Sequence, residues 1–503
     1  MKNLAHKNIL VLGLGASGLA LARWCARCGA NVTVADTRPA PPQLAPLQAS
    51  VPAANFVNAV MDGALLAGVA FDLVLKSPGL SPASISGVIA AAQAKSISCG
   101  NELSLFAQAL ADLKDDQAYS PRIIGITGTN GKTTVTSLAG QLIQRAGKSV
   151  AVAGNIGPTL LDTLAEKLDE QAAGNGPVLP EVWVLELSSF QLDGVTNFEP
   201  DVATVLNITQ DHLDWHETLP AYIAAKARVY GNGGLMLLNR DDPLVMAALP
   251  AQVKGKPTRS YLTFGCGEPK RPGDYGIETV NGMAWLVRAA QTDESIKRRK
   301  AEELVLHIQR LMPLEALRIH GRHNATNALA ALGLAVAVGC PLAPMLHGLR
   351  EYRGEPHRVE SVAVLDEVEY FDDSKGTNVG ATVAALAGLG AERKLVLILG
   401  GEGKGQDFLP LADPVSRYAR AVVLIGRDAP LIRAALQGVQ VELLDAVSMQ
   451  EAVSMAARQA QSGDAVLLSP ACASFDMFDN YQHRAQVFCG AVQGLAEDQG
   501  AVL

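Results

Sequence analysis

The segment GITGTNGKTT, residues 125–134, has the composition of a loop that holds phosphate groups. An apolar run at 122–124 precedes it, as expected for a strand, and apolar residues recur at helical spacing from 135 to 142. A strand, a glycine-rich loop and a helix are the context of a nucleotide-binding P-loop. The spacing departs by one position from the usual G-x-x-x-x-G-K-[ST] pattern, because Ile126 stands five residues before Gly131.

The residue types in this loop nevertheless fit phosphate. A phosphate cradle needs successive backbone N–H groups, glycine where a side chain would collide, a cation for the phosphates and a hydroxyl for magnesium. Gly128, Gly131, Lys132 and Thr133 supply these groups where the helix begins, and the positive end of its dipole also attracts anions. A glycine-rich turn without a ligand would not need Lys-Thr at that place, so we predict a nucleotide phosphate site.

A second glycine loop, GLGASG at 13–18, also follows a predicted strand and opens a predicted helix. With Asp36 at the end of the next strand, it matches the dinucleotide-binding fingerprint, and NAD is one interpretation. A tight strand-to-helix turn without a ligand is another. A third is a different pyrophosphate, with Asp36, Thr37 and Arg38 placed to contact ribose, uracil or phosphate.

Two further stretches carry candidate metal ligands. Glu186 ends an apolar strand, where an acid in a P-loop protein holds magnesium, although it could equally cap the next helix. His212 and His216 are four residues apart, but the zinc metalloprotease pattern requires Glu at 213, where this chain has leucine. We therefore expect one histidine to serve a magnesium site or the substrate, with a helix start as the structural alternative.

The elements that must position these residues alternate between strands and helices. Predicted strands cover 8–12, 31–35, 71–75, 182–187, 202–208, 395–401, 421–426 and 465–469, and helix-compatible stretches include 19–28 and 326–339. This rhythm indicates an α/β fold with parallel sheets. Three segments follow from it, at 1–104, 105–355 and 356–503. A possible hairpin around Asn281-Gly282 lies beside a charged run at 291–303.

Composition limits the function classes. The chain has 503 residues, too many for one core, and a formal net charge of −8 that argues against nucleic acid as a partner. No apolar run reaches the length of a membrane span, so we expect no membrane insertion and a cytoplasmic enzyme. We also expect a monomer.

Ten motifs occur in one order along the chain: TGTNGKTT (127–134), GNIG (154–157), LELSSFQL (185–192), NITQDHLDWH (207–216), AAKARVY (224–230), GRHNATNALAA (321–331), PHRVE (356–360), DDSKGTNVGAT (372–382), GGEGKGQDF (400–408) and SPACASFDMFDNY (469–481). Together they resemble the Mur ligases over nearly the whole chain. This family spells its P-loop TGTNGK[ST], which accounts for the unusual spacing. The departure is the stretch from about 267 to 310, which is longer than the family needs and contains no motif.

The resemblance implies three domains: an N-terminal Rossmann-like domain for the UDP substrate, a central P-loop ATPase-like domain and a C-terminal Rossmann-like domain for the amino acid. LSSFQL and SPACASFD are most similar to the members that add D-glutamate to UDP-N-acetylmuramoyl-L-alanine, through an acyl phosphate made with ATP, in peptidoglycan precursor synthesis. A sibling Mur ligase or a folylpolyglutamate synthase-like ligase is the nearest alternative. An NAD-dependent dehydrogenase and a catalytically silent nucleotide sensor are alternatives from other classes.

The resemblance also implies roles residue by residue. The catalytic set is Lys132, Glu186, His212, Lys226 and Lys375. Two magnesium ions are implied, with Thr133 and Glu186 on one and His212 and a carbamylated Lys226 on the other. ATP is implied at Gly128, Thr129, Asn130, Gly131, Lys132, Thr133, Thr134, Asn324, Asn327, Arg358 and Asp373, the last at the ribose. The UDP substrate is implied at Ser17, Asp36, Thr37, Arg38, Gly79, Asn155, Ser188 and Gln191. D-Glutamate is implied at Lys375, Thr377, Lys404, Ser474, Phe475 and Tyr481.

Structural alternatives exist for several of these residues. Lys226, among alanines, reads by itself as a surface lysine on a helix, and Lys404 as a solvated loop residue. Phe475 could belong to a core. Asn324 and Asn327 could cap or line a helix.

Overall fold

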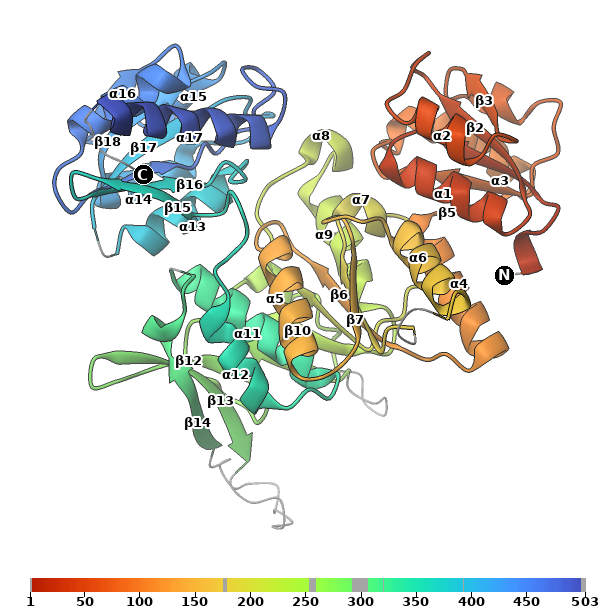
Figure 1. Ribbon diagram of the computed structural model, residues 1–503, viewed down its shortest axis with the longest axis horizontal. Helices are drawn as coiled ribbons and strands as arrows, with labels where there is room; N and C mark the ends of the chain where they lie inside the picture. The colour runs from red at the N-terminus through yellow and green to blue at the C-terminus, as the bar shows by residue number, and fades with distance from the viewer. Residues whose placement is uncertain are drawn as a thin grey trace.

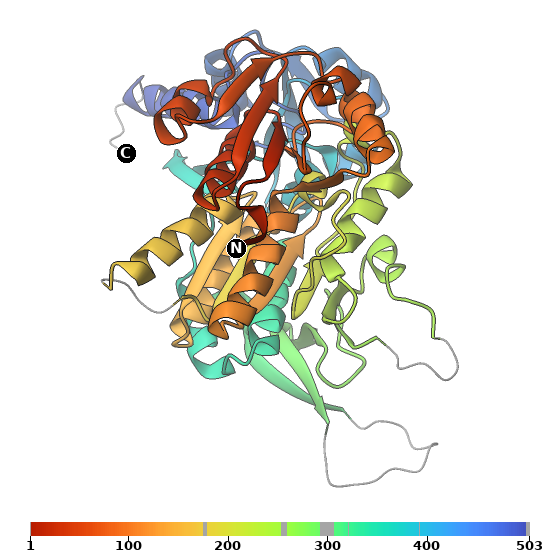
Figure 2. The same ribbon diagram turned by 90° about the vertical axis from the view of Figure 1, so that its right-hand side faces the viewer.

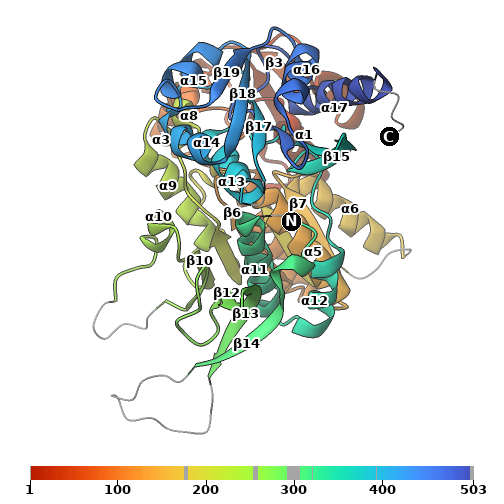
Figure 3. The same cartoon turned by 90° about the vertical axis from the view of Figure 1, so that its left-hand side faces the viewer.

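The computed structural model describes residues 2–174, 179–252, 259–291, 306–319, 321–391 and 393–498. Three α/β lobes follow one another along the chain, each built on its own largely parallel sheet (Figure 1). The N-terminal and C-terminal lobes lie on either side of the upper part of the central lobe, and Figures 2 and 3 show the same arrangement from its two ends. The charged run predicted at 291–303 lies almost entirely outside the described residues.

The N-terminal sheet has the order β3-β2-β1-β4-β5, and all its pairs are parallel. Its strands are β1 (Asn8–Leu12), β2 (Asn31–Asp36), β3 (Asn55–Asn58), β4 (Leu73–Lys76) and β5 (Ser98–Asn101). Its helices are α1 (Ala16–Arg27), α2 (Leu44–Ser50) and α3 (Ser86–Ala94). The strand order reverses beside β1, and ligands bind at such a switch point in open α/β sheets. The 13–18 loop lies at this edge.

The central sheet has the order β11-β10-β9-β6-β8-β7 and is also parallel. Its strands are β6 (Arg122–Thr127), β7 (Val150–Gly154), β8 (Val182–Glu186), β9 (Val202–Val205), β10 (Leu235–Asn239) and β11 (Tyr261–Phe264). Its helices are α4 (Glu102–Gln117), α5 (Lys132–Arg145), α6 (Leu160–Ala172), α7 (Ser189–Leu192), α8 (Leu213–His216), α9 (Leu219–Ala227), α10 (Pro243–Met246), α11 (Arg322–Ala337) and α12 (Leu342–Glu351). Strand β6, which leads into the P-loop, therefore lies between β8 and β9.

The C-terminal sheet has the order β15-β16-β20-β17-β18-β19, in which only the β15–β16 pair is antiparallel. Its strands are β15 (Glu360–Leu365), β16 (Val368–Asp372), β17 (Leu395–Gly400), β18 (Ala419–Ile425), β19 (Glu442–Asp445) and β20 (Ala465–Leu468). Its helices are α13 (Val379–Leu389), α14 (Ala412–Tyr418), α15 (Ala429–Ala435), α16 (Met449–Gln459) and α17 (Tyr481–Asp498). Because β16, β20 and β17 are neighbours and parallel, the loops after them meet at one edge.

A small antiparallel sheet extends from the central lobe (Figure 1). It contains β12 (Tyr275–Val280), β13 (Met283–Gln291) and β14 (Leu306–Pro313), and the β12–β13 turn holds Asn281 and Gly282. The predicted hairpin is therefore confirmed, and the stretch that departs from the family pattern is largely this sheet.

The predicted parallel α/β class is confirmed, but the expected boundary at 104/105 falls inside α4. That helix begins at Glu102, and its buried residues share one hydrophobic core with α1 of the first lobe and α6 of the central lobe. No loop separates the lobes at 104/105, because one helix packs against both. The boundary expected at 355/356 falls in the connection between α12 and β15.

No helix among the described residues is both long enough and apolar enough to span a membrane.

Candidate active site

The P-loop follows β6 and wraps the beginning of α5. Gly128 and Gly131 have φ values of 152° and 83°, a region that L side chains rarely adopt. A Cβ on Gly131 would lie 2.7 Å from Asn327 Oδ1, so the loop backbone packs tightly against α11. The Asn130 N–H donates to Asn207 Oδ1 at 2.8 Å, which ties the loop to the end of β9. The sequence therefore has glycine where the loop adopts positive φ values and where its backbone lies against the Asn327 side chain.

Lys132 and Thr133 begin α5, and their side chains contact different lobes. Lys132 Nζ donates to the carbonyl oxygens of Gly128 and Thr129 at 2.9 and 2.8 Å. Burial lowers the pKa of Lys132, while the charges of Glu186 and Asp211 raise it. The Thr133 hydroxyl accepts a hydrogen bond from Arg358 at 2.6 Å, which joins the P-loop to the third segment.

Glu186 ends β8 beside the P-loop strand and is only 1% exposed. Its Oε1 accepts a hydrogen bond from Asn155 Nδ2 at 2.7 Å. Its Oε2 is buried and accepts none from any described residue. A buried carboxylate oxygen without a donor fits a cation ligand, because leaving it bare would carry the full desolvation cost.

Lys226 lies on α9 and is 2% exposed, so the surface interpretation of this lysine is wrong. Its Nζ donates to Gly128 O at 2.8 Å and lies 3.5 Å from Thr127 Oγ1. Burial, and next the charge of Lys132, hold the pKa of Lys226 well below its ordinary value. The sequence could not show this, since an alanine-rich helix has no clear polar face.

The two histidines after β9 have different surroundings. His212 has a φ of 53°, and its Nε2 lies 3.6 Å from Asp211 Oδ2. Burial lowers the pKa of His212, while Asp211 raises it. His216 Nε2 instead hydrogen-bonds Ser189 Oγ at 2.9 Å, and burial lowers its pKa to about 4. His216 thus packs inside the lobe, which argues against a zinc site shared by the pair.

Asp211 is a site residue that the sequence interpretation missed. The charge of its carboxylate acts to raise the pKa of Lys132, Lys226 and His212, so Asp211 lies near three of the predicted catalytic residues. It also accepts a hydrogen bond from Asn378 at 3.3 Å. Its place in the NITQDHLDWH motif was the signal that could have indicated it.

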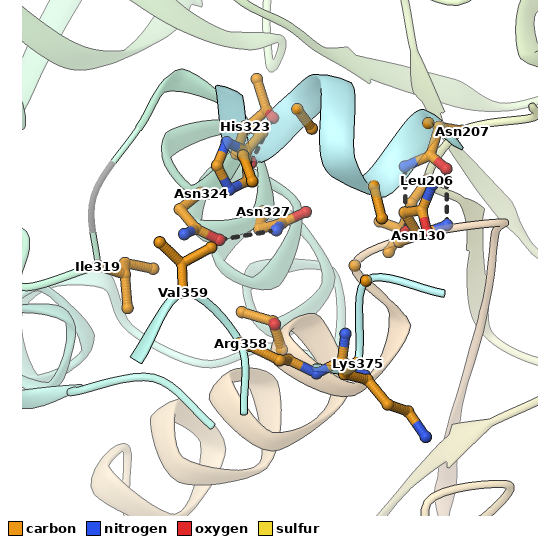
Figure 4. A pocket seen from close by; sticks show the side chains of 18 of the residues that line it. Asn130, Leu206, Asn207, Ile319, His323, Asn324, Asn327, Arg358, Val359 and Lys375 are labelled. Carbon is orange, nitrogen blue, oxygen red and sulfur yellow. Dashed lines mark hydrogen bonds between the residues drawn. The ribbon is translucent and has the colours of Figure 1, made fainter. Parts of the chain in front are cut away.

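A cavity of about 260 Å³ lies between the central and C-terminal lobes (Figure 4). It collects most of the predicted ATP residues, namely Asn130, Gly131, Thr134, Asn324, Asn327, Arg358 and Asp373, together with Lys375. Asn207, Ile319 and His323 also line it and were not predicted. Burial lowers the pKa of His323 to about 4, so its ring is neutral. Asn207 and His323 lie in recognised motifs, but nothing in the sequence pointed Ile319 toward the site.

Asn324 and Asn327 contact each other along the first turns of α11, where Asn327 Nδ2 lies 3.1 Å from Asn324 Oδ1. Both also line the cavity, so capping or lining a helix is not their whole environment. Figure 4 shows them on the same side of the cavity as His323 and Ile319.

Asp373 follows β16 and is 6% exposed. It accepts a hydrogen bond from Ser469 Oγ at 2.6 Å, and burial raises the pKa of Asp373 to about 7. It lines the cavity together with Arg358, whose charge opposes that rise.

The predicted amino-acid pocket uses the loops after three neighbouring strands. Lys375 Nζ lies 3.8 Å from the centre of the Tyr481 ring, and burial lowers the pKa of Lys375 to about 8. The charge of Lys404 lowers it further, although Lys404 itself is exposed. Ser474 is buried while Phe475 is 69% exposed, so the core interpretation of Phe475 is wrong. Thr377 lies in the same loop as Lys375 and donates its N–H to that residue's carbonyl at 2.9 Å.

The C-terminal lobe also contacts the P-loop through Asn378, whose Nδ2 donates to Asn130 Oδ1 at 3.0 Å. Together with the Arg358–Thr133 bond, this contact holds the third lobe against the nucleotide loop.

The carboxylate of Asp36 binds the backbone of the first glycine loop. A Cβ on Gly18 would lie 2.0 Å from Gly13 O, so the helix packs directly on the loop. Asp36 Oδ2 accepts from Leu14 N at 2.7 Å, and both carboxylate oxygens bind the Arg38 guanidinium. Arg38 and Thr37 are exposed beyond β2, and the bonded arginine holds the pKa of Asp36 at about 2.

Ser17 lies in the part of the 13–18 loop sequence that forms the first turn of α1. Gly79 is exposed in the segment after β4, whose Ser77 and Leu80 pack beside Gly13. Ser188 and Gln191 bond to each other across the first turn of α7, which gives them a capping role in this structure. Asn155 is exposed while its amide holds Glu186.

Three side chains that could ligate a metal lie together where no metal site was predicted. Among the residues that the structure describes, only His357, Glu360 and Asp372 form a group of three His, Cys, Asp or Glu side chains close enough to share an ion. His357 Nδ1 hydrogen-bonds Asp372 Oδ2 at 2.7 Å, so two members of this group already bind each other.

Three family models of Mur ligase domains match three successive parts of the chain, one in each lobe. The model for the MurD-like N-terminal domain of Mur ligases matches residues 7–100, the middle-domain model 126–335 and the glutamate ligase domain model 357–472. A protein of Albidiferax ferrireducens named UDP-N-acetylmuramoylalanine--D-glutamate ligase is 66% identical over 100% of this chain and 99% of its own. The chain belongs to the Mur ligase family.

A protein of the same name from Polaromonas sp. is 60% identical, with both chains covered completely. Solved Mur ligases share the fold at low identity. MurF of Thermotoga maritima, determined with ADP, matches with a TM-score of 0.56 at 15% identity, over 98% of this chain and 97% of its own. MurC of the same organism has a TM-score of 0.53 at 19% identity, over 97% and 100%.

Proposed function

We propose that this Mur ligase uses ATP to join D-glutamate to UDP-N-acetylmuramoyl-L-alanine through an acyl phosphate, a step of peptidoglycan precursor synthesis. The observation that carries the proposal is that one cavity joins P-loop residues of the central lobe to Arg358, Asp373 and Lys375 of the C-terminal lobe. Amide formation from an acid is uphill in water, so the acid, the phosphoryl donor and the amine must meet at such a junction. The names of the full-length relatives support the choice of substrates.

The donor set fits magnesium. The free Oε2 of Glu186 and the hydroxyl of Thr133 are hard oxygen ligands of the kind this ion prefers. We assign these two residues to one ion and His212 with Lys226 to a second. Bound magnesium would neutralise charge on the transferring phosphoryl group.

Lys226 suits carbamylation, because only a neutral amine reacts with CO₂. Its burial beside Lys132 lowers its pKa, which increases the neutral fraction. The product would be an anionic oxygen ligand in place of a cation that repels metal. Its existing contacts with Gly128 and Thr127 would place that group beside the P-loop.

The protein's own cations divide the remaining work. Lys132 would neutralise the γ-phosphate, and Arg358 reaches the same helix start from the other lobe. Asn324, Asn327 and Asp373 would hold the nucleoside. Lys375 and Lys404, whose charge helps to lower the pKa of Lys375, would attract the two carboxylates of D-glutamate. Thr377, Ser474, Phe475 and Tyr481 would surround them.

We assign the 13–18 loop and Arg38 to the UDP end of the substrate and Asn155 to its sugar end. Ser17, Asp36, Thr37, Gly79, Ser188 and Gln191 complete this assignment. NAD binding needs a free acid at this position to accept from the ribose hydroxyl. Both carboxylate oxygens of Asp36 already accept hydrogen bonds from Leu14 or Arg38, so a ligand would meet a guanidinium instead, and NAD is disfavoured. A cationic group at a helix beginning suits a diphosphate.

The proposal includes a monomer, because all three sets of pocket residues come from one chain, and a cytoplasmic location, because the reaction consumes ATP.

The test is phosphate release from ATP with UDP-N-acetylmuramoyl-L-alanine and D-glutamate, omitting each component in turn. Sustained release is expected only with all three. Equal activity with another amino acid would favour a sibling or folylpolyglutamate-like ligase. An absorbance change with NAD and an alcohol, but no phosphate release, would instead support the dehydrogenase. ATP binding without turnover of any amino acid would point to the nucleotide sensor.

A further inference from the structure

The side chain of Asn378, at the beginning of α13, makes four hydrogen bonds. Its Oδ1 accepts from the Ala381 N–H at 2.9 Å and from Asn130 Nδ2 at 3.2 Å. Its Nδ2 donates to Asn130 Oδ1 at 3.0 Å and to Asp211 Oδ2 at 3.3 Å. The amides of Asn378 and Asn130 therefore form a reciprocal pair across two lobes, in which each side chain donates to the other and accepts from it.

These four bonds use the full hydrogen-bonding capacity of a carboxamide, which has two acceptor and two donor positions. The Ala381 N–H can only donate, so it fixes the oxygen of Asn378, and the Asp211 carboxylate accepts, so it fixes the nitrogen. Aspartate at this position would have no donor, and serine would have only one. Asn378 is 5% exposed, so an unpaired partner here would be costly. The arrangement therefore selects asparagine.

The partner amide belongs to the P-loop, whose backbone is held separately by Asn207. The Asn130 N–H donates to Asn207 Oδ1 at 2.8 Å, and Asn207 Nδ2 donates to the Asn130 carbonyl oxygen at 3.0 Å. Figure 4 shows Asn130 and Asn207 side by side at one end of the cavity. Because these bonds use the backbone of Asn130, its side chain remains for Asn378.

Asn378 directly follows a short loop of the C-terminal lobe that carries residues assigned to ATP and to D-glutamate. These are Asp373, Lys375 and Thr377. The loop is compact, because the Gly376 N–H donates to the Asp373 carbonyl oxygen at 2.8 Å. A displacement of Asn378 from the P-loop would therefore also displace the residues assigned to the amino acid.

We propose that Asn378 is a positioning residue for amide formation: through its reciprocal pair with Asn130, it sets the distance between the P-loop and the 373–377 loop. This inference rests on the proposed function of those two loops. The amine can displace phosphate only when the two reacting groups lie at near-attack distance, and the loops that hold them belong to different lobes. Asn378 itself is not among the residues that line the cavity.

The experiment measures steady-state phosphate release by the full-length protein with ATP, UDP-N-acetylmuramoyl-L-alanine and D-glutamate. Asn378→Ser removes the amide but keeps a side chain that caps a helix equally well. We expect kcat to fall about 10- to 100-fold, the scale of a misplacement of about 1 Å. The KM for the UDP substrate should stay unchanged, because none of its assigned residues lies in the C-terminal lobe. Asn378→Asp, which keeps the size and the cap but has no donor, should lose at least as much kcat.

A variant of the partner residue tests the pair from its other end. Asn130→Ala removes the second amide but leaves the backbone bonds to Asn207 in place. Asn130 is also assigned to ATP, so this variant should lose activity by itself. Adding Asn378→Ser to it should cost little more, because the contact is already absent. Such non-additivity is expected of two residues that act through one contact.

Ser448→Ala is the matched control, because Ser448 caps α16 in the same lobe by accepting from the Glu451 N–H at 3.2 Å. Losing this cap should lower the melting temperature without changing kcat.

A normal kcat in Asn378→Ser, or an equal further loss in the parent and Asn130→Ala backgrounds, would overturn the positioning role. A raised KM for the UDP substrate in Asn378→Ser would also overturn it, by indicating a general structural defect. Absence of phosphate release by the parent protein with all three substrates would be a different result, because it would remove the proposed function and this inference with it.

Discussion

Lys132 and Lys226 donate hydrogen bonds to the same acceptor, the carbonyl oxygen of Gly128, at 2.9 and 2.8 Å. Burial, and next the charge of the nearby Lys132 ammonium, lowers the pKa of Lys226. Converting one of them to a carbamate would replace repulsion by attraction. This pair is the physical basis of our assignment of Lys226 as the modified residue.

Lys226→Ala should lose most activity, about 10²-fold or more, as expected when a group that orders charge at the reacting centre is removed. Acetate should restore part of it by filling the vacated space. The activity of the parent protein, which keeps Lys226, should also rise when bicarbonate is added, because carbamylation needs CO₂. Phosphate release with and without each additive measures this.

Lys167→Ala is the matched control for that prediction, because Lys167 is a helix lysine whose only described ion pair is with Glu170. It should respond to neither acetate nor bicarbonate. A Lys226→Ala variant with normal turnover would contradict the assignment.

Lys132→Ala should lower kcat by about 10²–10³-fold with little change in melting temperature, because Gly128 O, one of its two acceptors, still accepts a hydrogen bond from Lys226. Lys148→Ala, just beyond the other end of α5, should leave kcat unchanged. Steady-state kinetics and thermal melts of both variants test the assignment. Comparable turnover in the two variants would show that another cation neutralises the phosphate.

The affinity for D-glutamate should depend on pH through Lys375. Its pKa of about 8 means that the cation is present below that pH and is lost above it, whereas an ordinary lysine stays charged to about 10.5. The KM for D-glutamate should therefore be flat below pH 8 and rise above it. Lys375→Arg, which stays charged throughout, should show no such rise. Identical profiles for both proteins would rule out Lys375 as the titrating group.

Asp373→Asn should increase stability while impairing nucleotide binding. Burial raises the pKa of Asp373 to about 7 from an ordinary 3.8, so the folded protein binds more protons than the unfolded chain between those values. Its contribution to stability is thus lost as pH rises through that window, and above pH 7 a buried ionised carboxylate remains. The amide variant avoids this cost and can still accept from Ser469.

We therefore expect the variant to be more stable at pH 8, by a free energy of unfolding on the order of 3 kcal/mol, and the gain to shrink toward pH 5. Denaturant unfolding at both pH values measures this, and the KM for ATP should rise. The exposed Glu442→Gln should change neither quantity. A gain that is equal at pH 5 and pH 8 would mean that Asp373 does not titrate in this range.

Much of the fold followed from local pattern. The strand 8–12, the helix-compatible stretch 326–339 and the hairpin at Asn281-Gly282 were predictable, because apolar periodicity and turn residues act over a few positions. The P-loop was predictable for the same reason: backbone N–H groups, glycines and a lysine lie within eight residues of the chain.

Only the tertiary structure decided which distant residues meet. Arg358 reaches Thr133 across 225 positions, and Asn378 reaches Asn130 across 248. Lys226 looked exposed because helical periodicity cannot select a buried face among alanines, and its burial is decided by how α9 packs against the P-loop. A sequence records which groups exist, whereas close packing of separately predictable elements determines which of them share a low-dielectric site.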